Sequence, residues 1–365
     1  MSVETVARGP LPRANPDLVG HEGAERELRR LDEAGRLPHA ILLSGPRGIG
    51  KATLAFRLAR FLLAKSAENL PEMFGETSGR GLAIDPESSV FRRVASGGHA
   101  DLLTVERAYD PRRRRLRSEI IVEDTREIAG FFRLTAAEEG WRIVIVDGAE
   151  EMNRNAANAL LKILEEPPRR ALLLLVSHSP GRLPPTIRSR CRLLSMNPLI
   201  QPEVRRLLAQ YRPELTQPEA EALAELSEGS IGRAIDLADA GGLTLYRSLL
   251  EKIAWAPPID FAELHSLADK FARPDAEDTY RVVQELLSTF LARMIKRGVS
   301  DQLEDEDPVA GEREAMQWLF QHADPARWAA VRERIELGFA DTDQLNLDRK
   351  QAILGAFFAI EETAR

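Results

Sequence analysis

The sequence has 365 residues and a formal charge of -7, so it lacks the strong positive field of a protein that binds nucleic acid alone. A single hydrophobic core stops growing at about 250 to 300 residues, which predicts two or three domains. The single cysteine, Cys191, excludes an intrachain disulfide and an all-cysteine zinc cluster. No apolar run is long enough to cross a bilayer and residues 1–15 carry no signal-like stretch, so we expect a cytoplasmic protein without membrane contact.

Short apolar runs alternate with helical patterns in the first half, which predicts an α/β domain with a parallel sheet covered by helices. The predicted strands span 40–44, 102–105, 142–146, 171–176 and 191–196. The predicted helices span 51–63, 125–137 and 154–165. The last of these has Asn153 as its N-cap, and Pro167 prevents its continuation. The segment 66–98 is a long insertion without recognisable chemistry.

The strand pattern ends near Pro198, and the rest of the chain has helical patterns. Helices are expected at 203–210, 218–226 and 231–238, and a second helical region follows Gly241. Apolar residues between 282 and 294 recur at helical spacing. They form either a buried core or a face for partner chains. The acidic residues 304–307 are expected in a solvated loop.

A phosphate-binding loop is predicted where the first strand meets the first of these helices. Gly45, Gly48 and Gly50 precede Lys51 in the G-x4-G-K pattern. Glycines let the backbone amides surround phosphates, and the lysine adds a positive charge. The next position is expected to carry the hydroxyl that coordinates magnesium, but it holds Ala52, and Thr53 comes one residue late.

A second candidate element is the strand 142–146, which ends at Asp147. An acid after an apolar strand suits a carboxylate associated with a metal ion, although a capping or loop role is also open. A glutamate that activates water is expected at the following position in hydrolysing enzymes, but the residue is Gly148. Glu150 and Glu151 are displaced and fit the approach to the next helix.

Two longer segments carry a specific resemblance. Residues 147–168 read DGAEEMNRNAANALLKILEEPP, and residues 183–191 read LPPTIRSRC. Shorter matches are VGHE at 19–22, LPHA at 37–40 and LNLDR at 345–349. With these motifs in order, the chain resembles the clamp-loader family of bacterial DNA polymerase III, which are AAA+ proteins. The sequence of residues 177–183 is similar to that of the delta-prime branch of the family.

The resemblance implies a AAA+ base domain at 1–197, a helical lid at 198–240 and a helical collar at 241–365. It implies a hetero-pentamer with gamma or tau and delta subunits, acting on the sliding clamp and primed DNA. This branch resembles a stator without its own ATPase inside the DNA polymerase III holoenzyme. No cofactor is then required, ATP and magnesium binding without hydrolysis stays open, and the four-cysteine zinc module of many relatives is absent.

The resemblance also assigns roles to single residues. Arg190 matches the arginine finger that reaches a neighbour's ATP, where such a residue is worth about 10³ to 10⁵ in rate. Spacing alone leaves Arg190 an ordinary surface arginine beside Arg188 and Arg192. Gly232 occupies the sensor 2 arginine position, and Ser177 or His178 falls near sensor 1 or is structural.

Other interpretations stay open from the sequence. One is an active ATPase, similar to gamma or tau, that uses Lys51, Asp147 and a rearranged glutamate. Another is a stand-alone DNA-binding protein, which the acidic balance disfavours. The basic run 112–115 is either a solvated loop or a contact for DNA or a partner.

Overall fold

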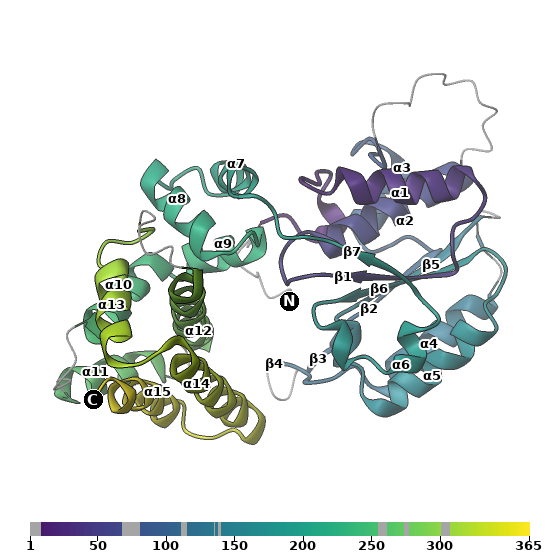
Figure 1. Ribbon diagram of the computed structural model, residues 1–365. Helices are drawn as coiled ribbons and strands as arrows, with labels where there is room; N and C mark the ends of the chain where they lie inside the picture. The colour runs from purple at the N-terminus through teal and green to yellow at the C-terminus, as the bar shows by residue number, and fades with distance from the viewer. Residues whose placement is uncertain are drawn as a thin grey trace. The chain divides into compact units, whose positions relative to one another are not determined.

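The computed structural model describes residues 9–67, 81–110, 115–134, 136–137, 140–254, 261–273, 277–300 and 307–365 (Figure 1). The chain divides into two compact units. The first comprises Met1–Glu203 with Gly229–Gly232, and the second comprises Val204–Glu228 with Arg233–Arg365. The helices expected to form a lid therefore group mostly with the C-terminal helices, and the three-domain division stays a prediction.

A parallel sheet of five strands forms the centre of the first unit, in the order β2, β5, β6, β1, β7. The strands are β1 (Ala40–Ser44), β2 (Leu102–Val105), β5 (Arg142–Asp147), β6 (Ala171–Ser177) and β7 (Arg192–Ser195). All five predicted strands are confirmed to within one residue at each end. The three inner strands, β1, β5 and β6, are buried and almost entirely aliphatic, as expected for a parallel sheet covered on both faces.

Alternate strand residues feed two hydrophobic cores, one on each face of the sheet. Ile41 and Leu43 pack with α2 (Lys51–Ala67) and parts of α1 (Glu22–Glu33) and α3 (Ser89–Ala95). Ala40 and Leu42 face the other way, toward α4 (Val122–Arg133), α5 (Arg154–Glu165) and α6 (Pro185–Arg188). The first unit is thus a three-layer α/β structure, with the sheet between two layers of helices.

Helix bounds in this unit correct some predictions. The expected helix 125–137 begins three residues earlier and ends at Arg133, because Asp124 accepts from the Ile121 amide and Leu134 is extended. Asn153 caps α5 as predicted, accepting from the Ala156 amide at 2.9 Å. Within the expected insertion 66–98, α3 adds buried residues to the core.

Short elements complete the first unit. Strands β3 (Tyr109–Asp110) and β4 (Arg115–Leu116) pair as a hairpin, and residues 112–114 of the basic run lie outside the described residues. The 3-10 helices are η1 (Pro12–Ala14), η2 (Ala149–Glu151) and η3 (Pro180–Arg182).

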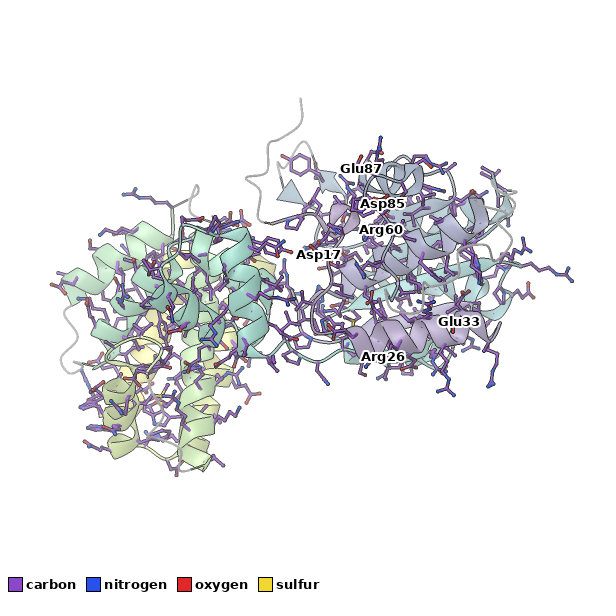
Figure 2. The ribbon with its side chains drawn as sticks, turned by 90° about the horizontal axis from the view of Figure 1, so that it is seen from above. Asp17, Arg26, Glu33, Arg60, Asp85 and Glu87 are labelled. Atoms are coloured by element: carbon purple, nitrogen blue, oxygen red, sulfur yellow. The ribbon has the colours of Figure 1, made fainter. Side chains whose placement is uncertain are left out.

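Two arginines of α2 bind the segment that precedes the first helix. Arg60 is 1% exposed and donates to the carbonyl oxygens of Arg13 and Asn15 at 3.0 and 2.7 Å (Figure 2). Arg57 donates to the carbonyl oxygen of Pro16, and it also pairs with Glu25 of α1 at 2.6 Å. Burial and, to a smaller extent, the charge of Arg57 together lower the pKa of Arg60 to about 10. These contacts fix the N-terminal segment to the helix that follows the phosphate loop.

The second unit is helical throughout its described residues. Its helices are α7 (Gln201–Tyr211), which starts in the first unit, then α8 (Gln217–Leu226), α9 (Ile231–Asp239), α10 (Gly242–Ala254), α11 (Phe261–Phe271), α12 (Glu277–Ser300), α13 (Glu312–His322), α14 (Pro325–Leu345) and α15 (Arg349–Ala364). The apolar residues of α12 between 282 and 294 are buried, which confirms the core interpretation.

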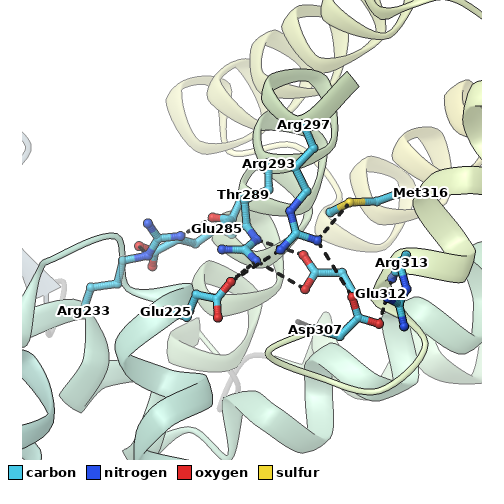
Figure 3. A network of polar contacts seen from close by, with 10 residues as sticks. All are labelled: Glu225, Arg233, Glu285, Thr289, Arg293, Arg297, Asp307, Glu312, Arg313 and Met316. Carbon is cyan, nitrogen blue, oxygen red and sulfur yellow. Dashed lines mark hydrogen bonds and ion pairs between the residues drawn. The ribbon is translucent and has the colours of Figure 1, made fainter. Parts of the chain in front are cut away.

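An ion-pair network joins α8 and α9 to α12 and α13 inside this unit (Figure 3). Arg293 of α12 pairs with Glu225 of α8 at 2.5 Å and with Glu312 of α13 at 2.8 Å. Arg233 of α9 pairs with Glu285 at 2.6 Å. Asp307, expected in a solvated loop, is instead nearly buried and lies 3.8 Å from Arg297; residues 304–306 lie outside the described residues.

Candidate functional site

The predicted phosphate loop lies at the carboxyl end of β1 and leads directly into α2, as the motif requires. Gly45, Gly48 and Gly50 have φ values of 150°, 75° and 108°. A Cβ at position 45 would lie 2.3 Å from the carbonyl oxygen of Met196. Glycine is therefore needed both for conformation and for the close approach of the chain that follows β7. The structure brings all the predicted loop residues together.

Lys51 begins α2 and folds back over the loop. Its ammonium donates to the carbonyl oxygens of Gly45, at 2.7 Å, and Pro46. The residue is 3% exposed. Burial lowers the pKa of Lys51 to about 8, against the opposing charges of Asp147 and Glu150. The cation that a phosphate needs is present at neutral pH, but it is easily deprotonated.

The segment Gly229–Gly232, which leads into α9, contacts the same loop. Ser230 Oγ donates to the Arg47 carbonyl at 2.7 Å, and the Gly232 amide donates to the Gly48 carbonyl at 2.9 Å. A Cβ at position 232 would lie 2.9 Å from the Gly48 Cα. No side chain fits there without a shift of the backbone, so the position expected for a sensor arginine is filled by the loop itself.

The hydroxyl expected after the lysine is not replaced by its neighbour. Ala52 is half-buried, and Thr53 is 7% exposed on the following position of α2. Successive helix residues are rotated by about 100°, so the two side chains leave the helix in different directions. The structure thus retains the phosphate cradle without the usual magnesium ligand from this helix.

Asp147 ends β5 at the same edge of the sheet. Burial and the charge of Glu106 raise the pKa of this carboxyl, while the charge of Lys51 opposes that rise. Gly148 follows in the left-handed conformation at φ 77°, and its amide donates to the Val176 carbonyl at 3.1 Å. A Cβ at position 148 would lie 2.6 Å from Glu151 Oε2. The chain therefore turns sharply where a catalytic glutamate is expected.

Glu150 is engaged elsewhere. Its Oε1 accepts from the backbone amides of His178, at 2.7 Å, and Ser179, at 3.2 Å. Although burial opposes it, the backbone amides of Glu150 and His178, together with the Ser177 side chain, hold the pKa of the Glu150 carboxyl low. Burial, with the nearby charge of Lys51, lowers the pKa of His178 to about 4. Glu150 thus fixes the turn after β6 through Oε1, and its lowered pKa makes this carboxylate a weak base.

Arg190 lies away from this loop, before β7 at the amino end of the sheet. Leu183 and Ile187 anchor its segment in the core. Its side chain is 37% exposed and pairs with Glu165 Oε1 at 2.8 Å. Cys191 is partly buried beside it, and burial raises the pKa of this thiol to about 12.

Some contacts were not foreseen from the sequence. Glu165 contacts Arg190 across 25 residues of sequence, and Arg233 joins Glu285 across 52. Neither pair follows from helical or strand spacing, so only three-dimensional placement reveals them. Among the described residues, no group of three or more His, Cys, Asp or Glu side chains is arranged to hold a metal ion. No described helix is both long and apolar enough to cross a membrane.

Comparisons with known proteins agree with these motifs. Residues 20–200 match the family model described as DNA polymerase III, delta subunit. The chain is 42% identical over 155 residues to the delta-prime subunit of Pseudomonas aeruginosa, covering 42% of this chain and 41% of the relative. It is 31% identical over 245 residues to the tau subunit of Escherichia coli, covering 66% of this chain and 34% of the relative.

The chain spans less than half the length of these two relatives. Among solved structures, a DNA polymerase III gamma subunit-related protein of Thermotoga maritima is 18% identical with a TM-score of 0.39, covering 93% of this chain and 99% of that one. That likeness adds nothing to the α/β fold already described. The clamp-loader motifs, the P-loop at the end of β1 and the matched segment 20–200 agree: the chain belongs to the DNA polymerase III clamp-loader family.

Proposed function

We propose that the chain is a delta-prime-like subunit of a DNA polymerase III clamp loader that hydrolyses little or no ATP itself. Its partners are gamma or tau and delta subunits in a cytoplasmic hetero-pentamer, through which it acts on the sliding clamp and primed DNA. The observation that carries this proposal is Gly148, whose left-handed backbone stands where hydrolysis needs a glutamate. Arg190 supports it, because an exposed arginine far from its own P-loop suits a finger given to a neighbour.

The rival function is an active ATPase similar to gamma or tau. It requires a glutamate near Asp147 that can activate water, and Glu150 is the nearest candidate in sequence. Glu150 instead accepts from the His178 and Ser179 amides, which disfavours this function. The isolated chain is therefore expected to show no turnover near the order of 1 s⁻¹ with magnesium-ATP.

Placing a glutamate at position 148 is not expected to produce ATP hydrolysis. Gly148→Glu forces a side chain into the left-handed conformation, which costs about 1 to 2 kcal/mol. It also meets the carboxylate of Glu151, so ATP turnover stays absent and thermal stability falls. Gly181→Glu is the matched control, because it adds the same charge at an exposed glycine with open space. Turnover that appears in Gly148→Glu and vanishes with Lys51→Ala would contradict the proposal.

The intact cradle supports ATP binding without hydrolysis as part of this function. Lys51 loses its proton as the pH rises through about 8, so ATP affinity is expected to be greatest below that pH and to fall above it. A charged hydrogen bond is worth about 1.5 to 3 kcal/mol, which corresponds to roughly 10- to 100-fold in affinity. Calorimetric titration from pH 7 to 9.5 measures this, and magnesium is expected to add little because Ala52 supplies no ligand.

Two substitutions in α2 test whether Lys51 causes this pH dependence of the ATP affinity. Lys51→Met is expected to weaken binding at pH 7 and to remove its dependence on pH. Lys65→Met changes an exposed lysine of the same helix, paired with Asp32, and is expected to leave both unchanged. An ATP affinity that is equal at pH 7 and 9.5 would show that Lys51 does not contact the phosphates.

A further inference from the structure

Arg190 is held from two sides by elements that meet at the amino end of the sheet. Its Nη2 donates to Glu165 Oε1 at 2.8 Å, and its Nη1 donates to the Thr186 carbonyl oxygen at 3.0 Å. Glu165 is the last residue of α5, and Thr186 lies in α6, which packs on α5. The guanidinium therefore bridges two helices that are both anchored in the core.

The segments that carry these partners are restrained locally. Pro167 follows α5 almost immediately, and Pro184 and Pro185 precede Thr186, so backbone φ is fixed on both sides. Leu183 and Ile187 are buried at 2% and 0% exposure. The acceptors for Arg190 thus have little freedom of their own.

The position of Glu165 argues against a role in stabilising its own helix. A carboxylate in the last turn of a helix opposes the macrodipole, whose negative end lies there. The pair is also exposed, with side chains 37% and 52% accessible for Arg190 and Glu165. Exposed pairs contribute only about 0 to 1 kcal/mol to stability. Stability alone therefore gives little reason for an acid at this position.

The geometry instead suits a role in orienting Arg190. A guanidinium presents five N–H donors in a rigid plane, and the two contacts use two of them. The others can then meet an anion while the group stays fixed at its base. An arginine side chain carries about 2 kcal/mol of rotamer entropy, part of which is lost in advance when it is held in place.

We propose that Glu165 is a positioning residue for Arg190, orienting its guanidinium toward the phosphates of a nucleotide on a neighbouring subunit. This inference rests on the proposed function, in which Arg190 acts in trans. Glu165 touches neither the nucleotide nor the reacting atoms, and it acts only through Arg190. Its effect is therefore confined to the rate and is smaller than that of Arg190 itself.

The test is a double-mutant cycle in a complex reconstituted from this chain, gamma or tau, and delta. Glu165→Gln is expected to lower the kcat of DNA-stimulated ATP hydrolysis at the neighbouring site that Arg190 serves about two- to five-fold, the size expected for an exposed pair, with KM for ATP unchanged. In the Arg190→Ala background the same change is expected to have no effect. Glu166→Gln, one residue along and also exposed, is the matched control with no effect.

A second measurement needs only the isolated chain. Arginine labelling by phenylglyoxal, read by mass spectrometry, is expected to be about two- to five-fold faster at Arg190 in Glu165→Gln than in the unchanged chain. The exposed Arg188 serves as the internal reference, with an unchanged labelling rate in both chains. This measurement is independent of assembly and of the trans function.

The possible results distinguish the positioning role of Glu165 from the trans role of Arg190 on which it depends. If Arg190→Ala lowers hydrolysis at the neighbouring site and clamp loading but Glu165→Gln changes nothing, the inference is wrong and the proposed function stands. An equal loss from Glu165→Gln with and without Arg190 overturns the inference as well, as does a rise in kcat. If Arg190→Ala itself leaves hydrolysis and loading unchanged, the trans role of Arg190 fails, and the positioning role fails with it.

Discussion

Replacing Arg190 by alanine is expected to lower ATP hydrolysis at the neighbouring site by about 10³-fold or more in a reconstituted clamp loader. The reason is electrostatic: charge that develops on the transferred phosphoryl group loses a fixed guanidinium in a site that excludes water. Because other sites in the complex keep their own residues, total turnover falls less than turnover at this site. Loading of the sliding clamp on primed DNA is therefore the sharper measurement.

Two controls make this result specific. Arg188→Ala removes an exposed arginine two residues earlier, and it is expected to leave loading unchanged. Arg190→Lys keeps the charge without the planar fork, and it is expected to recover only a small part of the rate. The assignment would be falsified if Arg190→Ala loaded clamps at the unchanged rate while the complex assembled normally.

Replacing Arg293 by methionine is expected to destabilise the second unit by about 3 to 5 kcal/mol, the cost of leaving a buried partner charge unpaired. Arg293 is only 12% exposed, and it is the partner at 2.8 Å of Glu312, which is 0% exposed (Figure 3). The same substitution breaks the contact with Glu225 of α8. Hydrogen exchange of α12 and α13 amides measures the loss within this unit directly.

Two further variants serve as controls for Arg293→Met. Arg332→Met breaks an exposed pair with Glu336, whose side chains are 39% and 44% accessible, and is expected to cost less than about 1 kcal/mol. Combining Arg293→Met with Glu312→Met removes both charges, and it is expected to recover more than about 1 kcal/mol of the loss. Equal exchange rates in Arg293→Met and the unchanged chain would mean that the pair contributes nothing.

The sheet and its phosphate loop could be predicted from the sequence because their signals are local. Strands β1, β5 and β6 are continuous aliphatic runs, and the glycines before Lys51 mark a turn between strand and helix. The N-cap of α5 could also be predicted, because Asn153 accepts a hydrogen bond from an amide only three residues away. Patterns within about ten residues contain the information that such elements need.

The rest depends on residues distant in sequence. Gly232, at the position expected for a sensor arginine, contacts Gly48 of the phosphate loop. Glu150 accepts a hydrogen bond from the turn after β6. Neither contact could be predicted from the sequence. The error in the bounds of α4 arose because the Asp124 contact with Ile121 starts the helix before its apolar pattern begins. The three-domain division remains a prediction, while the ion pairs of Arg233 and Arg293 show why α8 and α9 pack with α12.

Cys191 gives the segment that carries Arg190 an unexpected chemical property. Burial raises the pKa of this thiol to about 12, so very little thiolate is present near neutral pH. Oxidants and alkylating agents react with the thiolate, and the adjacent cysteine is therefore a poor target for them. The segment that carries Arg190 is therefore expected to keep its thiol unmodified when the chain is exposed to mild oxidants.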